Sequence, residues 1–222
     1  RRYEFDGKAA PFSASGTNLI GGLHPFGSYR HYGLFVTPKG DIYIPYSVEG
    51  LRKGDIQGLR VYASDGTLKH DRLVDVAVSR VAGMGVDPRG NIFMGLQVAP
   101  KGNEVPEFYQ GRFPKDAEAA NLAMRYRHTA AVVKFPPTGG SVKQAQDGQW
   151  VAHGVHAGGT GVTLTNGRVL ARGGLLVDHG GEIGCYCEAT RLDVDDYGRV
   201  IVPDVFLSRV TLYDGEGQEI TH

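Results

Sequence analysis

The chain has 222 residues, of which 41% are hydrophobic, so it is long enough to bury a substantial core. Its 24 basic and 24 acidic residues balance, which argues against a nucleic-acid-binding surface and against attraction to anionic membranes. The longest purely apolar stretches, such as residues 130–133, are too short to cross a bilayer, so we predict no membrane insertion. Its 33 glycines and 11 prolines are scattered and suit many short strands joined by tight turns.

Two kinds of short β-unit alternate along the chain. One is a pair of strands around a glycine turn, with β-branched or aromatic residues after the turn. Copies of it cover residues 36–44, 86–94 and 194–202, and a copy one residue shorter covers 164–171. The other, an alternating strand that runs into a turn, opens the chain at 3–7 and recurs at 59–66, 132–139, 176–181 and 210–217. Because the alternation is unbroken, each pair predicts two adjoining hairpins, which together make one four-stranded sheet.

Two of the pairs carry insertions. The larger insertion spans roughly residues 97–129 and contains the only segment that predicts a helix. Residues 114–126 are rich in alanine, with acidic residues early and arginine late, as an α-helix prefers. We therefore expect one short helix in an otherwise all-β protein.

The repeat resembles that of NHL-type β-propellers of the six-bladed, TolB-like kind. The likeness is clearest at residues 192–220, which include the Arg209-Val210 pair that opens the second half of that family's repeat. It implies an all-β fold in which residues 1–222 form a single propeller domain of about four blades plus an edge strand. Closed propellers have about four to eight blades, and family members close with five or six. We expect an incomplete propeller that continues at both ends as part of a larger polypeptide.

Propeller geometry predicts where a ligand would bind. Segments that lead into the innermost strand of each blade run along one face beside the central channel, so residues far apart in the sequence converge there. The residues in these segments are His31, Arg80, His153, His156, Cys185, Cys187 and Arg191. The aromatic-rich run 21–32 adds His24 and Tyr29, whose flat apolar ring can floor a pocket. We predict that His24, Tyr29, His31, Arg80 and Arg191 bind a protein, peptide or glycan.

Several of the same residues have the chemistry of metal ligands. Imidazoles and thiolates are the ligands that zinc and copper prefer. The candidate metal site comprises His31, His153, His156, Cys185 and Cys187. Two alternatives stay open for the cysteines, which are a disulfide in an oxidising compartment and plain packing as small apolar side chains. The histidines can equally serve as hydrogen-bond donors to backbone carbonyls.

The resemblance implies three classes of function. Most members of the family are binding platforms whose rim loops hold a peptide, protein, RNA or glycan, so a ligand- or protein-binding platform is the preferred function. Peptidyl-amidoglycolate lyases are propellers of this type with zinc held by histidines near the channel. The alternative is therefore a zinc- or copper-dependent lyase or hydrolase, with no catalytic residue assigned. A structural role in a large extracytoplasmic assembly is the third class, and a periplasmic or extracellular location is favoured.

One acidic run imitates the spacing of a calcium loop. Asp193, Asp195 and Asp196 precede Asp204 at the twelfth position, but the residues between them have the pattern of a strand. We predict that Asp195 and Asp196 brace a hairpin turn.

Overall fold

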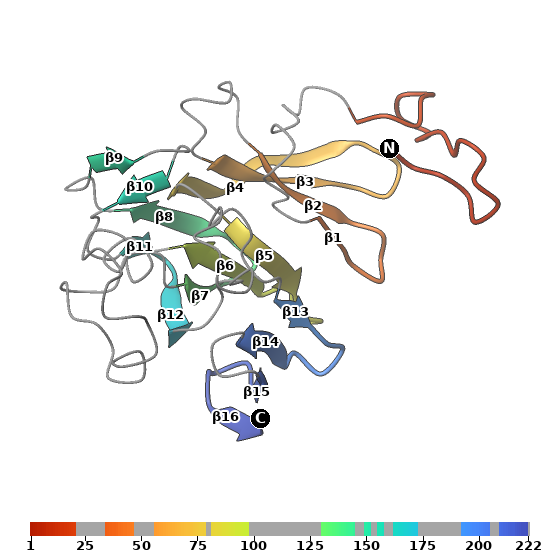
Figure 1. Cartoon of the computed structure of the whole chain (residues 1–222). Coiled ribbons are helices and arrows are strands. Elements are labelled where there is room, and N and C mark those ends of the chain that lie inside the picture. Colours follow the sequence, from red (N-terminus) through yellow and green to blue (C-terminus); the bar gives the residue numbers. More distant parts are fainter. Residues whose placement is uncertain are drawn as a thin grey trace, which may run out of the picture.

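Short antiparallel strands make up the ordered part of the chain. The computed structural model describes residues 1–20, 34–46, 56–78, 81–97, 130–144, 149–151, 155–157, 162–172, 192–204 and 209–221. These residues contain strands and no α-helix, which confirms the all-β class (Figure 1). The segment 114–126, predicted to be helical, lies outside them. No helix in the described ranges could span a membrane.

The strands form three large sheets and one small one. Sheet 1 has the order β1-β2-β3-β4-β8-β11 and comprises β1 (Phe35–Val36), β2 (Ile42–Tyr46), β3 (Ile56–Tyr62), β4 (Leu68–Val78), β8 (Gly140–Gln144) and β11 (Val162–Thr165). Sheet 2 has the order β12-β7-β6-β5 and comprises β5 (Val81–Val86), β6 (Ile92–Gln97), β7 (Ala130–Phe135) and β12 (Arg168–Arg172). Sheet 3 is β13 (Asp193–Val194), β14 (Val200–Asp204), β15 (Arg209–Tyr213) and β16 (Glu219–Thr221), in chain order. A separate pair joins β9 (Gln149–Val151) to β10 (Val155–Ala157).

Two of the four predicted four-stranded units form as expected. Strands β1 to β4 and strands β13 to β16 each pair antiparallel with the next strand in the chain. The predicted hairpin at 86–94 also forms, between β5 and β6. The first and last units of the repeat and the inner hairpin of the second therefore follow the sequence pattern.

The shortened copy at 164–171 was predicted to be a hairpin, and this prediction is wrong. Strand β11 pairs with β8 in sheet 1, whereas β12 pairs with β7 in sheet 2, so the turn between them crosses from one sheet to the other. The turn between β7 and β8 makes the opposite crossing, because β8 runs parallel to β4 of sheet 1. Asn166 fixes this corner, since its side-chain amide donates to the carbonyl of Gly139 at 2.9 Å. The described strands thus form three large sheets rather than four blades.

Sheet 2 lies between the other two and is buried on both faces (Figure 1). Alternate residues of a strand point to opposite faces, so Ile92 and Met94 pack toward sheet 1 while Phe93 packs toward sheet 3. The first core contains ten buried residues, namely Leu59, Val74, Val76, Met84, Val86, Ile92, Met94, Val133, Phe135 and Val142. The second contains Phe93, Val132, Leu192, Val194, Val200 and Val202. The first strands of the sheets also approach one another, because β5 contacts both β1 and β13.

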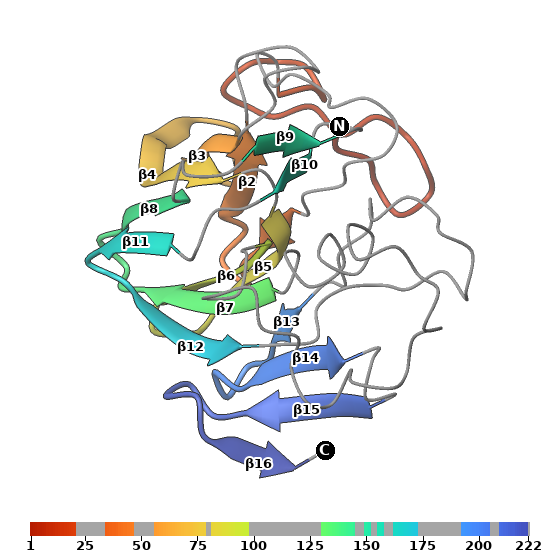
Figure 2. The same ribbon diagram turned by 60° about the vertical axis from the view of Figure 1, so that its left-hand side comes forward.

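The tight turns share one hydrogen-bond pattern. In turns 4–8, 37–41, 63–67, 87–91, 195–199 and 214–218, the first residue donates its N–H to the carbonyl of the fifth and accepts from the N–H of a glycine at the fourth. That glycine has a positive φ in every case, for example 83° at Gly90, as a hairpin with a type I turn and a bulge requires. The turns 63–67, 87–91, 195–199 and 214–218 lie along one edge of the sheets, on the left in Figure 2.

Aspartates at the first turn position fasten several of these turns. Asp87 is buried, and its carboxylate accepts from the backbone N–H groups of Arg89 and Asn91 and from the Asn91 side chain at 2.7–2.9 Å. Asp195 accepts from the N–H groups of Tyr197 and Arg199 in the same way, as predicted, whereas Asp196, for which we predicted the same role, is exposed. Because these oxygens are engaged within the turns, the aspartates serve structure at this edge.

Replacing Asp87 with alanine is expected to lower the free energy of unfolding by about 2 kcal/mol, because three part-buried hydrogen bonds lose their acceptor. The measurement is urea unfolding followed by circular dichroism. Asp196, an exposed acid in the neighbouring turn, is the matched control, and its alanine variant should lie within about 0.5 kcal/mol of the parent. Equal losses in both variants would show that Asp87 has no special role.

Candidate functional site

Most of the residues predicted to bind a ligand or metal lie outside the described residues. This group comprises His24, Tyr29, His31, Arg80, His153, Cys185, Cys187 and Arg191. The exception is His156, which lies in β10 opposite Trp150 of β9. Their convergence on one rim therefore stays a prediction.

The zinc or copper site also stays a prediction. Within the described ranges, no group of three or more His, Cys, Asp or Glu residues could hold a metal ion. If the predicted site exists, the purified protein should contain zinc or copper at one equivalent per chain by mass spectrometry of the metals. His156→Ala and Cys187→Ser should each lower that content at least tenfold, with His70→Ala, in β4, as the control. A metal content that is unchanged by all three substitutions would contradict the prediction.

The described strands do show how two of the predicted ligand-binding residues are placed along the chain. Arg80 immediately precedes β5, and Arg191 comes two residues before β13. The described contact between β5 and β13 lies at Gly85 and Val194, and a common surface for the two arginines stays a prediction.

A polar cluster spans strands β2, β3 and β4 of sheet 1. The guanidinium of Arg60 stacks over the ring of Tyr46 at 4.0 Å and its Nε donates to Asp71 at 2.7 Å. Arg72 donates to the Tyr46 hydroxyl at 3.4 Å. Tyr46 is the last residue of β2, directly before the connection 47–55. An aromatic ring flanked by two guanidinium groups therefore stands where this connection begins.

A surface pocket of about 410 Å³ lies at the edge that carries the tight turns. It is lined by Asn91, Lys134, Phe135, Pro136, Asn166, Gly167 and Arg168, and we call it the turn pocket. Lys134 and Arg168 sit on the paired strands β7 and β12, directly opposite each other in register. The turn pocket thus has two cations and two carboxamides above a floor that includes the buried ring of Phe135.

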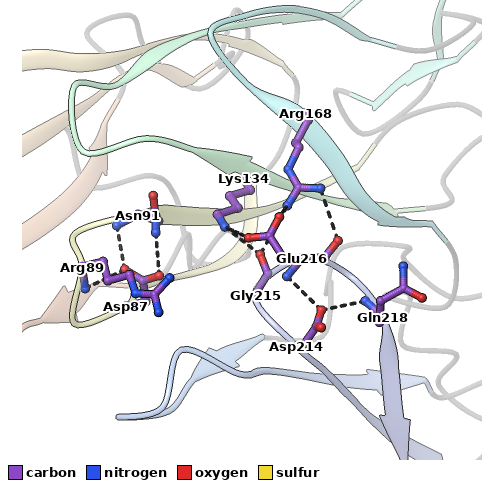
Figure 3. Close-up of polar contacts among 9 residues, drawn as sticks. All are labelled: Asp87, Arg89, Asn91, Lys134, Arg168, Asp214, Gly215, Glu216 and Gln218. Atoms are coloured by element: carbon purple, nitrogen blue, oxygen red, sulfur yellow. Dashed lines mark hydrogen bonds and ion pairs between the residues drawn. The ribbon is translucent and has the colours of Figure 1, made fainter.

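Both cations of the turn pocket are engaged by the outer turn of sheet 3 (Figure 3). The Lys134 ammonium donates to the Gly215 carbonyl at 2.7 Å and to the Glu216 carboxylate at 2.9 Å. Arg168 pairs with the other oxygen of the same carboxylate and donates to the Glu216 carbonyl at 3.2 Å. The Lys134 side chain is only 14% exposed and lies 5.6 Å from the centre of the Phe93 ring. This network is an electrostatic latch between sheets 2 and 3.

The latch changes the acidity of its carboxylates. The hydrogen bond from Lys134, then the charges of Lys134 and Arg168, hold the pKa of Glu216 below its usual value. Backbone hydrogen bonds, first from Gln218, lower the pKa of Asp214 in the same turn (Figure 3). A carboxyl whose pKa is lower in the folded state stabilises the fold above its unfolded pKa, and this stabilisation is lost as the pH falls through the folded value.

Glu216→Gln should therefore lower the melting temperature by a few degrees at pH 7, because one carboxylate serves two cations. The difference from the parent protein should shrink as the pH falls from the usual glutamate pKa through the lower pKa of Glu216 in the folded state, because the parent carboxyl then becomes protonated. Differential scanning fluorimetry from pH 3 to pH 8 measures both effects. Glu4→Gln, in an exposed turn, should leave the melting temperature unchanged at every pH, and a pH-independent deficit in Glu216→Gln would contradict the electrostatic explanation.

The turn pocket was not predicted from the sequence, although the sequence contains a signal for it. Lys134 occupies the repeat position held by Val61 in sheet 1 and Leu212 in sheet 3, where side chains point toward a neighbouring sheet. A single lysine among apolar equivalents marks a charge that needs a partner. Comparison with known proteins adds nothing to this geometry, since no protein-family model and no curated protein matches the chain. The functional assignment therefore depends on the repeat, the sheets and the side chains described above.

Proposed function

We propose that this chain is a ligand- or protein-binding platform of the β-propeller type, which holds its partner at the edge of the sheets opposite the tight turns. The proposal depends on a structural difference between the two edges of the sheets. Hairpin turns and their aspartates close one edge with hydrogen bonds inside the turns. The connections 47–55 and 98–129, which are longer than these turns, leave from the other ends of the strands. Binding residues are commonly placed on such longer loops above a rigid scaffold.

The stacking of the sheets supports treating them as blades. In a propeller each blade packs face to face on its neighbours, and the innermost strands lie next to one another around an axis. Sheet 2 is covered on both faces, and its first strand contacts the first strands of sheets 1 and 3. A linear stack of sheets would not require those first strands to meet on one side.

We propose His24, Tyr29, His31, Arg80 and Arg191 as the contact set for a protein, peptide or glycan. Aromatic and guanidinium groups suit all three, because a ring offers flat apolar surface and a guanidinium offers a fork of donors. The cluster of Tyr46, Arg60 and Arg72 has the same chemistry at the start of one connecting segment, which extends the proposed surface onto sheet 1.

Binding to immobilised panels of peptides and oligosaccharides tests the proposal. Tyr29→Ala and Arg80→Ala should each reduce capture of a bound panel member at least tenfold while the melting temperature stays within about 2 °C. Tyr197→Ala and Arg89→Ala are the matched controls, since both residues are exposed in tight turns at the other edge, and they should bind normally. If the first pair unfolds the protein, or if the controls lose binding equally, the proposed edge is wrong.

A further inference from the structure

The lining of the turn pocket is cationic. It contains the side chains of Lys134 and Arg168, and its other residues are uncharged. Within the described part of the chain, the carboxylate that pairs with both cations is that of Glu216, which belongs to the turn 214–218 of sheet 3 and lies outside the lining. The carboxylate of Asp214 is engaged by backbone N–H groups of the same turn. One carboxylate thus pairs directly with two cations at the wall of this pocket.

Both cations keep donors that the latch does not use. An ammonium group has three hydrogens to donate and a guanidinium has five. Lys134 donates to the Gly215 carbonyl and the Glu216 carboxylate, whereas Arg168 donates to this turn through its two terminal nitrogens. Among the described residues, the third hydrogen of Lys134 and the Nε–H of Arg168 therefore have no acceptor. The Arg168 side chain is 47% exposed, so an anion from solvent can reach it.

The two carboxamides of the lining present their oxygens as acceptors. The Asn91 Nδ2 donates to the Asp87 carboxylate at 2.7 Å (Figure 3), and the Asn166 Nδ2 donates to the Gly139 carbonyl at 2.9 Å. Because these two partners can only accept, they fix which end of each carboxamide is the nitrogen. Within the described ranges neither Oδ1 atom has a donor, so each can accept from a hydroxyl of a ligand.

We propose that the turn pocket binds a small hydroxylated carboxylate, which is the chemistry of a sugar acid. The ligand carboxylate accepts from Lys134 and Arg168 in charge-assisted hydrogen bonds, and its hydroxyls donate to the carboxamide oxygens of Asn91 and Asn166. Pro136, which is half-buried in the lining, offers apolar surface to the C–H groups of the ligand. The volume of about 410 Å³ suits one small ligand of this kind.

Glu216 is a built-in competitor of this ligand. The carboxylate of Glu216 and that of the ligand have the same charge and share the same two cations, so each weakens the binding of the other. Removing the charge of Glu216 should therefore strengthen ligand binding, although it weakens the latch between sheets 2 and 3. A merely structural role for Lys134 and Arg168 would not give these opposite effects.

Titration of the intact chain with glucuronate at low ionic strength, followed by NMR, tests the proposal. The side-chain amide signals of Asn91 and Asn166 should shift saturably. Glucose has hydroxyls without the carboxylate and acetate has the carboxylate without hydroxyls, so each should bind at least about tenfold more weakly. A disaccharide that ends in glucuronate distinguishes two sources of this chemistry. Equal binding assigns the pocket to the end of a glycan, and weaker binding assigns it to a free sugar acid.

Isothermal titration calorimetry with glucuronate compares three variants. Arg168→Gln should weaken binding about tenfold, because a charge-assisted hydrogen bond is lost. Glu216→Gln should strengthen binding several-fold while it lowers the melting temperature. Arg89→Gln is the matched control and should bind like the parent, since Arg89 is an exposed cation in the neighbouring turn 87–91 that does not line the pocket.

The absence of saturable shifts in the parent protein would overturn the proposal. So would binding of glucose or acetate as tight as that of glucuronate, or a Glu216→Gln variant that binds no more tightly than the parent. The NMR titrations need the parent protein alone, so the test remains decisive even if Arg168→Gln does not fold.

Discussion

Replacing Gly139 with alanine is expected to lower the free energy of unfolding by about 3 kcal/mol, from a left-handed backbone and a backbone clash together. Gly139 has a φ of 74°, and a Cβ atom there would lie 1.7 Å from the carbonyl oxygen of Leu73. The neighbour is backbone rather than the end of a flexible side chain, so β4 or the corner must move. Urea unfolding followed by circular dichroism measures the loss.

The variant Gly7→Ala separates the cost of the left-handed backbone from the cost of the clash with the Leu73 carbonyl. Gly7 also has a positive φ, 86°, but a Cβ atom there meets nothing within 4 Å. Its variant should lose only about 1 kcal/mol, the cost of the left-handed backbone alone. Hydrogen exchange of β8 and β11 adds a second readout, because Val74 of β4 pairs with Gly140 of β8 and the clash should loosen that pairing. Equal losses at the two glycines would mean that the corner is more open than described.

This corner also shows where sequence reasoning failed. Hairpins at 36–44, 86–94 and 194–202 could be predicted because their pairing is local, with a glycine in the left-handed region fixing the register. The partners of β7, β8, β11 and β12 depend on how two turns pack on each other, through Asn166 and the closely packed glycines. Contacts between residues so far apart leave no periodic signal in the sequence.

The features of the candidate site also differ in whether the sequence could predict them. A role for Asp195 in a turn followed from its spacing to a glycine, and the structure confirms it. The partner of Lys134 could not be predicted, because Glu216 lies in a different unit of the repeat and meets Lys134 only when sheet 3 packs on sheet 2. The sequence could show that a charge occupied an apolar position, but only the packing of the sheets identifies the anion that compensates it.

Phe93→Ala is expected to lower the free energy of unfolding by about 4 kcal/mol, because a fully buried aromatic side chain leaves a cavity between two sheets. Phe93 is 0% exposed in the second core, against Val132, Val194 and Val200. Its loss also removes the ring that lies 5.6 Å from the Lys134 ammonium, so the latch between sheets 2 and 3 should weaken. Denaturant unfolding gives the free energy of unfolding.

Ile201 tests the same repeat position in sheet 3, on which no other described sheet packs at this face. It is equivalent to Phe93 but is half-buried, so Ile201→Ala should lower the free energy of unfolding by only about 1 kcal/mol. The difference between the two variants measures how far burial by a following sheet, rather than the strand itself, sets the importance of this position. A loss at Ile201 as large as that at Phe93 would contradict this explanation.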